Sequence, residues 1–141
     1  MKIAIGNHDI EDLEALMDHL VFEQYYSFDY QNIHFISLGT EEEEEEEYLD
    51  MSNDKAKEQL AFVQSDLEKA SSNPNIDWIV VYFHRLMYSS PSENPVYPTL
   101  RNTYHPLFNK YGVDLVLQAH NHNYERKHIL SNSIALVHLL Q

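Results

Sequence analysis

The sequence predicts an α/β protein built around a central, largely parallel β-sheet. Two apolar runs, residues 78–83 and 113–117, have the composition of strands that are buried inside a sheet. Amphipathic helical patterns, with apolar residues every three or four positions, occupy residues 56–70 and 100–111. Helices that alternate with buried strands are typical of a layered α/β domain with parallel central strands.

Both helical patterns carry end signals. The helix over 56–70 can begin at either of two N-cap residues, Ser52 or Asn53. The helix over 100–111 is followed by Gly112, which is suited to the left-handed conformation that often ends a helix. We therefore expect the first helix to begin close to Ser52 or Asn53 and the second to end close to Gly112.

The remaining elements are shorter. Residues 25–30 and 33–38 are rich in aromatic and β-branched side chains and flank Gln31-Asn32, which predicts a β-hairpin. Residues 134–140 have the composition of a last strand, and apolar residues at helical spacing predict a helix over 11–20.

Length and composition limit the classes of protein to which the chain can belong. Its 141 residues suit a single domain, 1–141. It has no cysteine, which excludes disulfides, thiolate metal ligands and a cysteine nucleophile. A net charge of −14 argues against a nucleic-acid or membrane partner. Seven consecutive glutamates, residues 41–47, are expected to form a solvated, low-complexity acidic loop.

Residues that bind metals follow three of the apolar runs. Ligands bind beyond the carboxyl ends of parallel strands, so side chains that follow different strands can meet at one edge of the sheet. The candidates follow the runs 3–5, 78–83 and 113–117, and they are Asn7, His8, His84, His120 and His122. A His-x-His pair on an extended backbone turns both imidazoles to the same side, where they can reach two neighbouring metals. Two metals about 3.5–4 Å apart are a common device for clamping a phosphoryl group.

These residues lie in motifs that resemble a known family. Gly6-Asn7-His8-Asp9, the strand-end His84 and Ala119-His120-Asn121-His122 resemble the last three metal-site motifs of the calcineurin-like metallophosphoesterases. The sequence around these motifs is similar to the purple acid phosphatase branch over residues 25–38, 111–117 and 123–126. The resemblance implies a layered metallophosphatase-like α/β/β/α sandwich, here incomplete at its N-terminus.

The resemblance also implies roles for single residues. Asn7, His84 and His120 would bind the second of two metal ions (Fe, Zn or Mn), and His122 would bind the first. His8 would act on the substrate phosphate, by stabilising the transition state or protonating the leaving oxygen. The reaction would be the in-line attack of a metal-bound hydroxide on a phosphate ester.

The chain departs from the family pattern in its metal ligands. The family takes two further aspartates from upstream motifs that contain Gly-Asp, and none of the three glycines here is followed by aspartate. Without bridging carboxylates, two close dications repel each other, so we expect at most one metal in this chain alone. Ala119 stands where the family has glycine, which matters if that position requires a positive φ.

Three functions remain open at this point. The chain can be a fragment of a phosphomonoesterase, a truncated and inactive metal-binding or interaction domain, or a phosphodiesterase or nucleotidase. The loop over residues 85–98 is expected to line the cleft for a small phosphate-ester substrate. His34, among aromatic neighbours in a predicted strand, is expected to be a hydrogen-bonded core residue.

Overall fold

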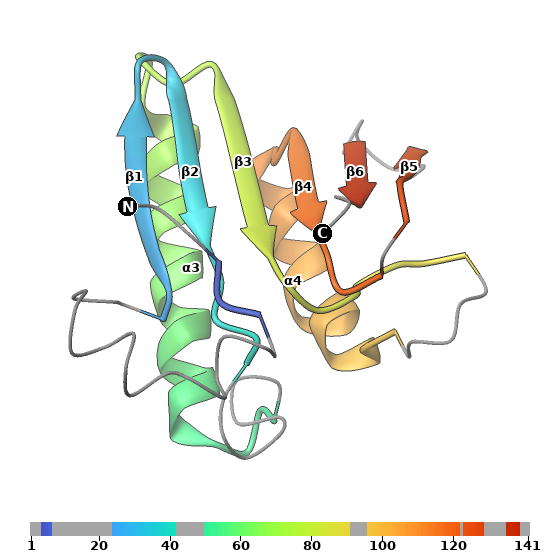
Figure 1. Ribbon diagram of the computed structural model, residues 1–141. Helices are drawn as coiled ribbons and strands as arrows, with labels where there is room; N and C mark the ends of the chain where they lie inside the picture. Colours follow the sequence, from blue (N-terminus) through green and yellow to red (C-terminus); the bar gives the residue numbers. More distant parts are fainter. Residues whose placement is uncertain are drawn as a thin grey trace, which may run out of the picture.

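The computed structural model describes residues 4–6, 24–41, 50–90, 96–121, 123–128 and 135–138 (Figure 1). The described residues form two helices and one six-stranded sheet of order β1-β2-β3-β4-β6-β5. The strands are β1 (Tyr26–Tyr30), β2 (Ile33–Ser37), β3 (Trp78–Phe83), β4 (Leu115–Gln118), β5 (Glu125–His128) and β6 (Ala135–His138). The predicted α/β class is confirmed, and the helix expected over 11–20 lies outside the described residues.

The centre of the sheet is parallel, as predicted. β2, β3, β4 and β6 pair in parallel with their neighbours, while β1 and β5 pair antiparallel at the two edges. β1 and β2 form the predicted hairpin, and Gln31 in its turn has a φ of 56°. β5 was not predicted, because the residues Glu-Arg-Lys-His lack the apolar pattern of a buried strand.

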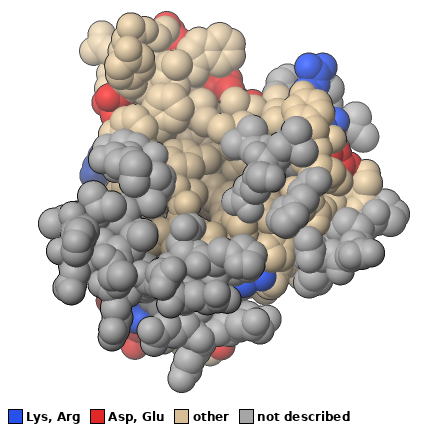
Figure 2. Space-filling model, viewed as in Figure 1, with Lys and Arg blue, Asp and Glu red and all other residues tan. Residues whose placement is uncertain are grey.

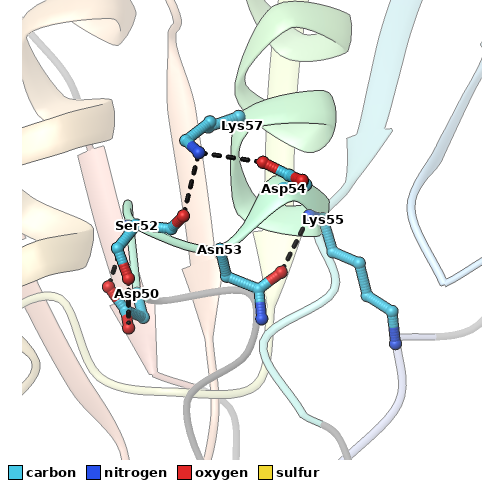
Figure 3. Close-up of polar contacts among 6 residues, drawn as sticks. All are labelled: Asp50, Ser52, Asn53, Asp54, Lys55 and Lys57. Atoms are coloured by element: carbon cyan, nitrogen blue, oxygen red, sulfur yellow. Dashed lines mark hydrogen bonds and ion pairs between the residues drawn. The ribbon is translucent and has the colours of Figure 1, made fainter.

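Helix α3 (Asp54–Ser72) begins at Asn53, one of the two expected cap residues. The Asn53 side chain accepts a hydrogen bond of 2.9 Å from the backbone N–H of Lys55, and Lys57 contacts Asp54 at 2.9 Å (Figure 3). The apolar stripe of the helix is buried, with Ala56, Val63, Leu67 and Ala70 each at most 4% exposed.

Helix α4 (Pro98–Tyr111) begins with a proline, whose missing N–H costs nothing in the first helical turn. It ends at Gly112, which adopts the expected left-handed conformation with a φ of 71°. The helix buries Leu100, Tyr104 and Phe108. No helix in the described part of the chain has both the length and the hydrophobicity needed to cross a membrane.

Both helices cover the same face of the sheet (Figure 1). Ile36, Val81 and Val116 point from the strands toward the helices and form the centre of the core. Strand alternation places a second set of side chains on the opposite face, where Phe28 stacks on Phe35 with a centroid distance of 5.0 Å. Few charged side chains lie on the described part of that face (Figure 2). The described chain therefore contains one helix layer and one sheet of the expected sandwich.

His34 lies on the helix-covered face of β2 and is held between two carboxylates. Its Nδ1 lies 2.6 Å from Asp29 Oδ1 on β1, and its Nε2 lies 2.8 Å from Asp66 Oδ2 on α3. Because both ring nitrogens face carboxylate oxygens, both donate, and the ring is an imidazolium. Burial opposes that charge, but the hydrogen bonds and charges of Asp66 and Asp29 outweigh it and raise the pKa of His34. His34 is thus a hydrogen-bonded core residue, as expected.

The pKa directions at this cluster predict how stability varies with pH. The raised pKa of His34 stabilises the fold fully below the unfolded value of about 6.5, and this contribution is lost as pH rises through the folded pKa. Burial disfavours the Asp66 carboxylate, but hydrogen bonds from His34 and Ser27 lower its pKa. The contribution of Asp66 to the stability of the fold is therefore lost only as pH falls through this lowered pKa. We expect His34→Gln to cost roughly 1–3 kcal/mol between about pH 4 and pH 6.5, and less in alkali.

Urea unfolding of both proteins over a pH series measures this difference. His105→Gln is the matched control, because burial lowers the pKa of His105 and its stabilising contribution is lost as pH falls instead. A His34→Gln difference that is the same at every pH would contradict the imidazolium assignment.

Candidate functional site

Two of the predicted metal ligands meet at the carboxyl edge of the sheet. Phe83 pairs with Gln118 at the ends of β3 and β4, and the Ala119 N–H then donates to the carbonyl of His84 at 3.1 Å. This register brings His84 Nε2 within 3.0 Å of His120 Nδ1. The ring planes are nearly perpendicular, at 77°, and the buried His84 is only 4% exposed.

Gly6 is the third residue at this edge. A Cβ added to Gly6 would lie 2.8 Å from Nδ1 and 2.9 Å from Cε1 of His84. The Gly6 backbone therefore lies directly against the imidazole, an approach that only glycine permits. Residues that follow three different apolar runs thus come together here. Asn7, His8 and His122, the other predicted site residues, lie outside the described residues.

The backbone at His120 is a tight, strained turn. His120 has a φ of 68°, and the N–H of Asn121 donates to the carbonyl of Ala119 at 2.8 Å, which closes a γ-turn around His120. The expectation of an extended backbone through His120 is therefore wrong. Ala119 does not adopt a positive φ, so the missing family glycine causes no strain at that position. The positive φ of His120 is a backbone strain of roughly 1–3 kcal/mol, and strain of this kind clusters at functional sites.

Hydrogen bonds from the loop after β3 hold this turn in place. The Asn121 amide donates to Ser89 Oγ at 2.8 Å, and the Ser90 N–H donates to the carboxylate of Glu125 at 3.1 Å. The buried side chain of Gln118 accepts from the N–H of Met87 at 3.0 Å. Glu125 was expected to support the site in an ion pair with Arg126, whereas the structure shows it accepting from Ser90. Sequence reasoning missed Ser89, Ser90 and Gln118, because single serine and glutamine side chains carry no distinctive spacing.

A buried ion pair lies one residue beyond His84. Arg85 contacts Glu41 at two points, with Nε 2.5 Å from Oε1 and Nη2 2.6 Å from Oε2. The Glu41 side chain is 1% exposed and that of Arg85 is 13% exposed. The expectation of a solvated loop is therefore wrong for Glu41, the first residue of the acidic run. Residues 42–47 lie outside the described residues.

The distance between His84 Nε2 and His120 Nδ1 suits two ligands of one metal ion. Zinc binds imidazole nitrogen at about 2.1 Å, so two tetrahedral ligands lie about 3.4 Å apart. The observed separation of 3.0 Å needs only a small opening of the pair. In the described part of the chain, no group of three or more His, Cys, Asp or Glu side chains is arranged to hold a metal. The pair thus fits part of a ligand shell, and a third ligand has to come from other residues.

The close contact at Gly6 makes Gly6→Ala a sensitive probe of His84. We expect a loss of about 1–3 kcal/mol and altered ring ¹⁵N shifts of His84, because the methyl group overlaps the imidazole. Thermal unfolding and NMR measure both effects. Gly112→Ala is the control: it forces alanine to a φ of 71° in open space, so it should destabilise without changing the His84 signals. Unchanged His84 signals in Gly6→Ala would contradict the contact.

The positive φ of His120 predicts an inverted order of stability. We expect His120→Gly to be more stable than His120→Ala by about 1 kcal/mol, because only glycine adopts this backbone without strain. Chemical unfolding of the two variants measures the difference. At His105, inside helix α4, the same pair should show the reverse order, since glycine destabilises helices. An equal or reversed order at position 120 would remove the evidence for strain.

Comparison with known proteins agrees with this arrangement. Residues 2–124 match the family model described as calcineurin-like phosphoesterase. Human acid phosphatase type 7 is 36% identical over 114 residues, which cover 72% of this chain and 25% of that protein. Purple acid phosphatase 15 of Arabidopsis thaliana is 29% identical over 148 residues, covering 94% and 26%. A solved structure of PhoD, 14% identical, superimposes with a TM-score of 0.64 and covers 93% of this chain and 33% of its own. The chain spans about a quarter of the length of the human and Arabidopsis relatives. It belongs to the calcineurin-like phosphoesterase family.

Proposed function

We propose that this chain is the histidine-bearing part of a metal-dependent hydrolase that acts on small phosphate monoesters. The observation that carries the proposal is the pair of facing nitrogens, His84 Nε2 and His120 Nδ1, 3.0 Å apart at the carboxyl edge of the sheet. Membership of a phosphoesterase family supports the reaction class. Similarity to acid phosphatases supports a monoester substrate.

In this proposal each site residue has one task. His84 and His120, together with the amide oxygen of Asn7, hold one metal ion, and His122 belongs to the shell of a second ion. A bound ion supplies Lewis-acid polarisation of the phosphoryl group and acidifies a water molecule. His8 donates a hydrogen bond to the phosphate or a proton to the leaving oxygen.

The described geometry also supports a limit of one metal for the chain alone. The facing histidines supply two nitrogen ligands, and the sequence has no Gly-Asp motif to supply the bridging aspartate of the family. A second dication close to the first would then be poorly neutralised. The net charge of −14 favours a small substrate over a polyanion such as a nucleic acid.

The test measures zinc binding and the hydrolysis of p-nitrophenyl phosphate by the 141-residue chain and by His84→Ala. We expect about one equivalent of zinc for the unchanged chain and at least about tenfold weaker binding for the variant, because one of its ligands is lost. His105→Ala is the matched control, since it removes a histidine from α4 instead of the sheet edge. Equal zinc binding by all three proteins would overturn the metal assignment.

A second candidate for the chain alone is an inactive metal-binding or interaction domain, because the described residues bring together two histidine nitrogens and no group of three metal-binding side chains. Zinc binding that depends on His84, with hydrolysis at background in all variants, would support it for the chain alone. The reading frame upstream of Met1 then decides the function of the whole protein, since Gly-Asp motifs there would complete the metal site. Faster hydrolysis of bis-p-nitrophenyl phosphate than of the monoester would indicate a phosphodiesterase.

A further inference from the structure

We propose that Arg85 is a positioning residue for this site: its buried ion pair with Glu41 fixes the backbone that carries His84 and keeps the guanidinium from binding phosphate. The link to metal binding rests on the proposed function. The positioning of His84 is a property of the metal-free chain and can be tested without it.

The ion pair is rigid because several contacts share it. The Arg85 guanidinium donates a charge-assisted hydrogen bond from Nη2 to Glu41 Oε2 at 2.6 Å, and its Nε lies 2.5 Å from Oε1 in an ion-pair contact. A third donor, Arg85 Nη1, contacts the hydroxyl of Tyr97 at 2.8 Å. The guanidinium also lies 5.2 Å from the centre of the Tyr97 ring. Removal of either charge would leave the other buried without its partner.

The ion pair extends the contact between two chain segments beyond their strands. Leu38, the first residue after β2, donates its N–H to the carbonyl of Tyr82 in β3 at 3.1 Å. Further along, Thr40 Oγ1 accepts from the N–H of Arg85 at 3.3 Å. Among the described residues, the Glu41–Arg85 pair is the last contact in this series. His84 therefore lies in a backbone held from the β2 side through Arg85 and from the β4 side by Ala119.

The same arginine closes the base of the loop that follows His84. Tyr97, which the guanidinium contacts, is the N-cap residue of α4, and its N–H donates to the carbonyl of Leu86 at 2.8 Å. Arg85 thus joins three segments at one point: the exit of β2, the exit of β3 and the start of α4. Loss of this junction would release His84 on the side facing the loop.

An arginine beside a proposed metal ligand would ordinarily be assigned to phosphate binding, because its fork matches phosphate oxygens. Here the charge of Arg85 is already balanced by a carboxylate that is 1% exposed. Phosphate would have to displace Glu41 and leave that carboxylate buried without its partner, which is unfavourable. The structure therefore assigns Arg85 to holding the site.

The test records histidine ring ¹⁵N signals of the metal-free 141-residue chain at one mildly alkaline pH. We compare Glu41→Gln, Arg85→Met and Arg85→Lys with two exposed controls that remove the same charges, Glu58→Gln and Arg126→Met. The ring signals of His34, bound between Asp29 and Asp66, report whether the fold is intact. We expect changed His84 and His120 signals with unchanged His34 signals in Glu41→Gln and Arg85→Met, a smaller change in Arg85→Lys, and none in the controls.

Titrations with zinc and with inorganic phosphate complete the test. Loss of a residue that orients a ligand costs about 10–100-fold in metal affinity, so we expect at least tenfold weaker zinc binding in Glu41→Gln and Arg85→Met. Phosphate binding should not depend on the arginine itself. If the unchanged chain binds no zinc, the metal assignment fails, and the ring signals alone decide the positioning role.

Three results would overturn the positioning role. The first is an intact Glu41→Gln or Arg85→Met variant whose His84 signals match those of the unchanged chain. The second result applies if both of these variants fail to fold. It is an Arg85→Lys variant whose His84 and His120 ring signals are identical to those of the unchanged chain. The third is a loss of inorganic phosphate binding in an Arg85 variant with unchanged His84 signals, which would make Arg85 a phosphate ligand.

Discussion

The parallel register of β3 between β2 and β4 determines where His84 and His120, the two described histidines of the candidate site, lie. Val81 and Val116 pair directly across β3 and β4, and both are fully buried against the helices. A shift of one residue would turn these side chains out of the core, so the hydrophobic effect enforces the register. With this register the two strands end side by side, and His84 and His120 face each other across the edge.

Past this edge, side chains replace the missing strand partners. Gln59 of α3, which is fully buried, accepts from the N–H of Gly39 at 2.7 Å and donates to its carbonyl at 3.0 Å. The same amide contacts the hydroxyl of Tyr104 on α4 at 3.0 Å. Backbone groups buried without partners would cost free energy, so these bonds allow the chain to leave β2 inside the protein. They also fix the path that carries Glu41 to Arg85.

The sequence predicts those parts of the site that follow from strand ends. His84 and His120 follow strands with apolar patterns, and parallel topology then requires their convergence. Glu41 could not be identified in this way, because its burial depends on an arginine 44 residues away and it is one of seven consecutive glutamates. The turn at His120 was also missed, since no local residue signals a positive φ there. Pairwise tertiary contacts, which no periodicity encodes, account for both failures.

The candidate site is held in place by contacts within the protein. The two imidazoles satisfy each other with one hydrogen bond, while the Glu41–Arg85 pair and the Ser89–Asn121 bond hold the backbones that carry them. In small zinc domains the binding energy of the metal is the folding energy. Here the two proposed ligand nitrogens already face each other, so a metal ion bound as proposed would replace the hydrogen bond between them and would need further ligands. Carboxylates supplied by other parts of a longer protein would then add to a preformed pair with little loss of conformational entropy. Burial of the Glu41–Arg85 pair, which is costly in isolation, is physically consistent with the proposed positioning role because it fixes the backbone of a proposed ligand in advance.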